Sequence, residues 1–177
     1  MNAGQSSIDV ANYFIKKNKS EFIGIRSNRD PRKPKVNWLT VDDVIKIHEN
    51  IIYEIGGKSG IHNKQDLKYA LERPLIQISG TTEKGTFEQI CECAYDIGNC
   101  FIDARAQIAA TVFLTLCNLN EYNVAFKVGD IFEIFPKVLN DANERLELKE
   151  FKKIMMDHLV FAVPKNDIKL LYGANQR

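Results

Sequence analysis

The stretch Ala104-Arg105-Ala106-Gln107-Ile108-Ala109-Ala110-Thr111-Val112-Phe113-Leu114-Thr115-Leu116-Cys117-Asn118-Leu119 decides the fold. After its first four residues, apolar side chains occur on nearly every side of a helix drawn with about 3.6 residues per turn. A short helix that is apolar all round is typical of the centre of a globular core. We therefore predict that the segment from about Ala104 to Leu119 is the most buried element of the protein.

Amphipathic helical patterns lie on both sides of this segment. Apolar residues recur at spacings of three and four within residues 41–55, 67–71, 87–97, 131–138 and 148–159. Strand signals are confined to residues 21–25 and to the turn at residues 58–62. The sequence therefore predicts a mainly α fold.

Polar residues, glycine and proline mark the ends of the helices before the central segment. Thr40 followed by Asp43 is close to a capping box, and Gly56-Gly57 predicts the end of the same helix. Asn63 predicts the start of a second helix that Pro74 ends, and Thr86 predicts the start of a third.

The length, charge and composition of the chain limit the classes of protein to which it can belong. A chain of 177 residues is long enough to bury one core, and its net charge of +1 favours neither nucleic acid nor a membrane surface as a partner. No apolar run approaches the roughly 20 residues of a membrane span, and the polar start of the chain is not a signal peptide, so we expect a cytoplasmic protein. The four cysteines contain no CxxC pair and are predicted to be reduced, buried thiols.

The first 37 residues are predicted to be an extension that precedes the main domain. It contains an amphipathic segment at residues 8–15 and then a basic stretch, Arg26 to Lys35, that Pro31 and Pro34 interrupt. The basic stretch has the pattern of a solvated linker, because the prolines break any helix there. A phosphate-binding arm is the alternative interpretation.

The nine residues Asn99-Cys100-Phe101-Ile102-Asp103-Ala104-Arg105-Ala106-Gln107 resemble the signature of the Fic/Doc (Fido) family. That signature reads His, any residue or Pro, Phe, any residue, Asp or Glu, Gly or Ala, Asn, any residue, Arg. Phe101, Asp103 and Ala104 fit it. Asn99, Arg105 and Gln107 stand where the family has its histidine, asparagine and arginine.

The surrounding sequence extends the resemblance to about residues 38–160. The family's typical "Leu-Thr-Val-x-Asp-Val" start, its Doc-like "Gly-Ile…Arg-Pro" segment and its "Leu-Asn-Gly-Tyr" ending correspond to residues 39–44, 60–74 and 119–122. The last of these reads Leu-Asn-Glu-Tyr here. The resemblance implies a Doc-like helical bundle with a short flap or hairpin at residues 38–160, followed by a C-terminal tail at 161–177.

The resemblance also assigns roles to residues. In the family, the histidine removes a proton from a target hydroxyl, which the Asn99 amide cannot do near neutral pH. Gln107 cannot clamp phosphate as the family's arginine does. The backbone at Ala104, Arg105 and Ala106 is a candidate anion site at a helix start.

Asp103 matches the family's magnesium-binding acid, or alternatively caps the helix that follows. Lys58, Ile61 and His62 match the flap that positions a target peptide, and Phe101 matches a core aromatic. His48 is expected to be a hydrogen-bonded core residue.

The function implied is that of a Fic/Doc-like pseudoenzyme in the bacterial cytoplasm that binds a protein. The partner would be an antitoxin or a translation-related target, in a toxin–antitoxin-like or mobile-element system, and no cofactor is expected. The alternative is a divergent transferase that moves AMP or phosphate from a nucleotide to a protein hydroxyl and uses Mg²⁺. The sequence indicates no oligomeric state.

Overall fold

The computed structural model describes residues 36–76, 84–126 and 129–160, without the side chain of Phe132. The described α-helices are α2 (Val41–Ile55), α3 (Lys64–Glu72), α4 (Thr86–Ile97), α5 (Arg105–Leu119), α6 (Asp130–Ile134) and α7 (Leu148–Asp157). The 3₁₀ turns are η1 (Arg73–Leu75), η2 (Gly98–Cys100) and η3 (Phe135–Val138), and the strands are β1 (Asn123–Val124) and β2 (Leu159–Val160). The mainly α prediction is confirmed.

Several predictions fall outside the described residues. They are the amphipathic segment at 8–15, the strand at 21–25, the basic stretch from Arg26 to Lys35 and the tail at 161–177. In the described residues no helix has both the length and the apolar character to cross a membrane.

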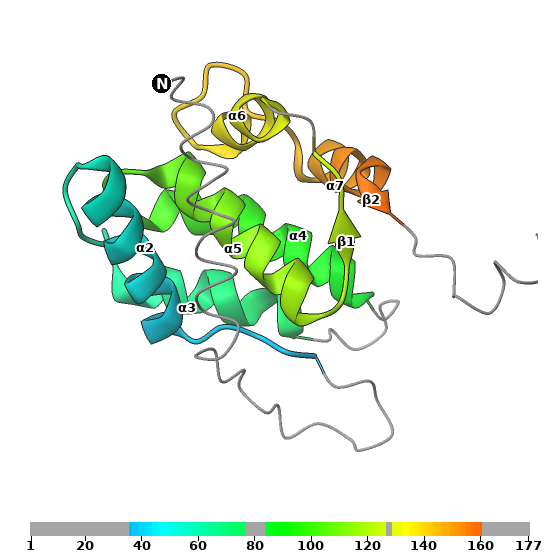
Figure 1. The fold of residues 1–177 in the computed structure, drawn as a ribbon, viewed down its shortest axis with the longest axis horizontal. Helices are drawn as coiled ribbons and strands as arrows, with labels where there is room; N and C mark the ends of the chain where they lie inside the picture. Colours follow the sequence, from blue (N-terminus) through cyan, green and yellow to red (C-terminus); the bar gives the residue numbers. More distant parts are fainter. Residues whose placement is uncertain (1–35, 77–83, 127–128, 161–177) are drawn as a thin grey trace, which may run out of the picture.

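Helices α4 and α5 form the centre of the molecule. Figure 1 shows α5 crossing the middle, with α4 behind it and α2 and α6 at its flanks. No residue of α5 is exposed, as its all-round apolar pattern predicts. The prediction that α5 is the most buried element is nevertheless wrong, because nine of the twelve residues of α4 are buried against nine of the fifteen of α5. Polar Gln89 and Glu92 of α4, at 7% and 3% exposure, are enclosed as well.

Helix starts follow the predicted signals in two of three cases. Thr40 and Asp43 form a complete capping box at the start of α2, and the Asn63 side chain accepts a hydrogen bond from the backbone N–H of Gln65 at the start of α3. The prediction for Thr86 is wrong: it is the first residue of α4, and Gly85 holds the capping position without a side-chain hydrogen bond.

Phe113 of α5 lies at the centre of a cluster of aromatic side chains. It is fully buried, and its ring lies 5.9 to 6.1 Å from the rings of Phe87, Phe126 and Phe135. These rings come from α4, from the segment after β1 and from η3, so one side chain joins three parts of the chain.

Phe113→Ala should therefore lower the free energy of unfolding by about 3 to 5 kcal/mol, because the cavity is walled by rings that cannot collapse into it. Urea denaturation followed by circular dichroism measures the loss. Leu114→Ala, at a neighbouring and only partly buried position, is the control and should cost clearly less. A loss below about 1 kcal/mol for Phe113→Ala would place this ring outside the core.

A buried carboxylate joins α4 to α7. The Glu92 side chain, only 4% exposed, accepts hydrogen bonds from Lys84 Nζ and Lys152 Nζ, each at 2.7 Å. Lys152 Nζ also donates to Glu88 Oε1 at 2.8 Å. Burial raises the pKa of Glu92, but the hydrogen bonds from Lys152 and Lys84 outweigh it and hold the pKa below its usual value.

Glu92→Gln should destabilise the protein at neutral pH by about 3 kcal/mol, because two ammonium groups then lose a buried anion. A carboxyl group whose folded pKa is lowered contributes stability above its unfolded pKa, and that stability is lost as pH falls through the folded pKa. The difference between wild type and Glu92→Gln should therefore shrink below about pH 4.

Urea denaturation at several pH values measures this difference. Glu88→Gln, at a side chain that is 43% exposed, is the matched control and should have a much smaller effect. A difference that stays constant from pH 7 to pH 3 would contradict the role given to the Glu92 carboxylate.

Candidate functional site: the loop before helix α5

The loop from Gly98 to Ala104 connects α4 to α5 and contains the first six residues of the stretch 99–107 that resembles the family signature. It begins at Gly98, directly after α4, where the chain lies close against the first residues of α5. A Cβ added at Gly98 would lie 2.6 Å from the carbonyl oxygen of Arg105 and 3.0 Å from Leu139 Cδ2. A residue with a side chain does not fit there without moving the backbone of α5, so Gly98 sets the start of the loop.

The loop ends in a left-handed residue, and this overturns the prediction that Asp103 caps α5. Ala104 occupies the capping position with φ 56° and ψ 31°, and no side chain caps the helix. A non-glycine residue in this conformation costs about 1 to 2 kcal/mol. The Asp103 carboxylate makes no hydrogen bond to the first N–H groups of α5.

Asp103 instead ties the loop to the end of α2. Its Oδ2 atom accepts a hydrogen bond from the backbone N–H of Lys58 at 2.8 Å. Its carbonyl oxygen lies 2.9 Å from His48 Nε2, and since a carbonyl only accepts, Nε2 carries the proton. The His48 ring, 1% exposed, also packs on the Phe101 ring at 4.3 Å between centroids. The predictions of a hydrogen-bonded core histidine and a core aromatic are confirmed.

Asn99 is bonded through both atoms of its amide group. Its Oδ1 atom accepts from Arg105 Nη2 at 2.6 Å and from the backbone N–H of Asn140 at 2.9 Å. Its Nδ2 atom donates a long bond of 3.5 Å to the carbonyl oxygen of Val138. Asn99 thus joins η2, the start of α5 and the segment after η3.

Arg105 is held by the same network. Its Nη1 atom donates to Asp141 Oδ2 at 2.7 Å and its Nε atom to the carbonyl oxygen of Gly98 at 3.4 Å. Gln107 lies within the first turn of α5, and its side chain makes no hydrogen bond or ion pair with another described residue. The structure therefore brings Asn99 and Arg105 together but leaves Gln107 outside their network. Anion binding at Ala104, Arg105 and Ala106 stays a prediction.

The predicted flap lies directly beside the loop. Ile61 and Phe101 form an isolated antiparallel bridge. The N–H of His62 donates to the carbonyl oxygen of Cys100 at 2.9 Å, and the N–H of Ile102 donates to that of Gly60 at 3.3 Å. Lys58 and His62 are exposed, and Ile61 is partly buried. Two segments that are distant in sequence, each singled out as a candidate, are thus paired.

No cluster of metal-ligating side chains forms in the described part of the chain. It contains no group of three or more His, Cys, Asp or Glu side chains that could hold a metal ion. The four cysteines are free and buried, as predicted, and burial raises the pKa of Cys91 and Cys100 to about 12. These two thiols stay neutral and are poor nucleophiles at physiological pH.

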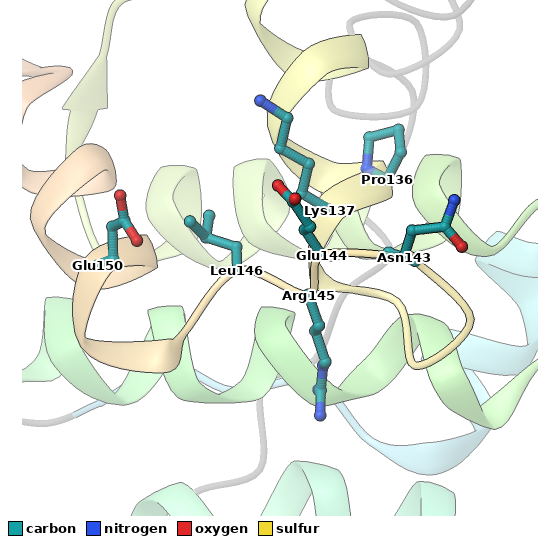
Figure 2. Close-up of a pocket in the computed structure, with 8 residues that line it drawn as sticks. Pro136, Lys137, Asn143, Glu144, Arg145, Leu146 and Glu150 are labelled. Carbon is teal, nitrogen blue, oxygen red and sulfur yellow. The ribbon is translucent and has the colours of Figure 1, made fainter.

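An open pocket of about 800 Å³ lies apart from the loop, between η3, residues 142–146 and the first turn of α7. Figure 2 shows Arg145 pointing away from Lys137 and Glu144. Its guanidinium carbon lies 4.3 Å from the centre of the Tyr95 ring, and its Nε donates to the carbonyl oxygen of Val138 at 3.0 Å. Lys137, Glu144 and Glu150 are exposed and form no ion pair with another described residue.

Comparison with known proteins yields no match: no family model, no curated protein and no solved structure is similar to this chain.

Asn140 and Asp141 are the residues of the network that sequence reasoning missed. They lie 41 and 36 residues beyond their partners Asn99 and Arg105. Residues 140–143 read Asn-Asp-Ala-Asn, an ordinary polar loop composition, so no sequence signal links them to the altered signature.

Asn99→His should destabilise the fold by about 2 to 3 kcal/mol, because imidazole cannot accept from both Arg105 and the Asn140 N–H while also donating to Val138. Asn99→Asp keeps both acceptor interactions and should cost less. Asn143→His, at an exposed loop position, is the control and should change stability by no more than about 0.5 kcal/mol. Thermal and urea unfolding measure all three. Equal stability of Asn99→His and wild type would show that the network is unimportant.

Ala104→Gly should stabilise the protein by about 0.5 to 1 kcal/mol, because glycine adopts the left-handed conformation without the Cβ penalty. Ala110→Gly is the matched control: Ala110 lies within α5, where the same change should destabilise by about 1 kcal/mol or more. Urea denaturation of both variants measures whether each change raises or lowers the free energy of unfolding. A loss of stability in Ala104→Gly would contradict the left-handed turn.

Proposed function

We propose that this chain is a catalytically inactive Fic/Doc-like protein that acts by binding another protein at the paired loop and flap. The observation that carries the proposal is the pairing of residues 60–62 with residues 100–102. It joins residues 60–62, which include the Ile61 and His62 that the resemblance assigns to a target-positioning flap, to residues 100–102 of the stretch that resembles the family signature. The groups at this surface that differ from the family signature, Asn99 and Arg105, serve structural hydrogen bonds.

The flap offers an edge for an extended partner segment. In the observed pairing, Gly60 and His62 direct backbone groups toward the loop, so those of Ile61 point to the opposite side. The backbone N–H and C=O groups of Ser59 and Ile61 make no hydrogen bond with another described residue. An unpaired strand edge binds extended peptides by adding a strand. The exposed side chain of Ile102, which lies over Gly60, adds apolar surface beside this edge.

Loss of catalysis is the second part of the proposal. The Asn99 amide does not titrate near neutral pH and therefore supplies no general base. The Arg105 guanidinium is already paired with Asp141 and Asn99, and the Gln107 side chain is uncharged. A bacterial toxin–antitoxin-like or mobile-element setting, with an antitoxin or a translation-related target as partner, rests on the sequence resemblance alone.

Binding is tested with a photo-crosslinking amino acid placed at Ser59 in the full-length protein inside bacterial cells. A discrete crosslinked protein is expected from Ser59 and not from Lys153, an exposed control position on α7. Ile61→Pro removes the backbone N–H that points outward from the edge, and Ile102→Asp places a charge beside it. Either change should reduce the yield of crosslinked protein at least about tenfold, as a loss of more than about 1.4 kcal/mol of binding free energy would. Equal crosslinking from both positions, or none from Ser59, would contradict the proposal.

Inactivity is tested separately. Calorimetry with ATP, GTP or UTP and Mg²⁺ should detect no micromolar binding, and incubation with labelled nucleotides and bacterial lysate should label no protein above background. Removing a general base typically lowers the rate by about 10² to 10⁴. Labelling that Asp103→Ala abolishes, with a free energy of unfolding close to that of wild type, would instead support the divergent transferase.

A further inference from the structure

We draw no further inference here: the strongest candidate, the open pocket of about 800 Å³ between η3, residues 142–146 and the first turn of α7, is lined by exposed side chains of mixed charge, and nothing in the structure shows what occupies it.

Discussion

The close approach of Gly98 to the start of α5 is the constraint on which the candidate site depends. Both helices are enclosed, so the chain must pass from one to the other at the edge of the core within a few residues. The space at Gly98 admits no side chain, and the turn into α5 uses a left-handed alanine. The backbone of the loop is therefore determined by core packing before any side-chain chemistry is considered.

This geometry explains what the polar residues of the loop do. A loop that reverses between buried helices leaves backbone and side-chain polar groups that need partners. Asn99, Asp103 and His48 supply them, and together they connect the loop to α2, to residues 58–62 and to the segment after η3. Among the described residues, these hydrogen bonds occupy the Asn99 amide and one oxygen of the Asp103 carboxylate, whereas the backbone groups of Ser59 and Ile61 make no hydrogen bond with another described residue.

Much of the fold could be predicted from the sequence, because apolar periodicity and capping residues are local signals. The α2 capping box, the Asn63 cap and the central α5 were all predicted from them. The β1–β2 ribbon was not, since two-residue strands carry no pattern. The Asp103 cap was wrong because Ala104 holds the capping position in a left-handed conformation, which no local pattern predicts for alanine. The Asn99 network was missed because its partners lie 36 to 41 residues away on a loop.

Asn99 and Arg105 stabilise the fold by bonding to each other. A double-mutant cycle with Asn99→Ala, Arg105→Met and the combined variant measures this directly, using the free energy of unfolding in urea. Because the bond is charge-assisted and partly buried, we expect a coupling energy of at least about 1 kcal/mol. Additive effects of the two substitutions, with a coupling energy near zero, would show that the side chains are independent and would contradict the structural role given to Asn99 and Arg105.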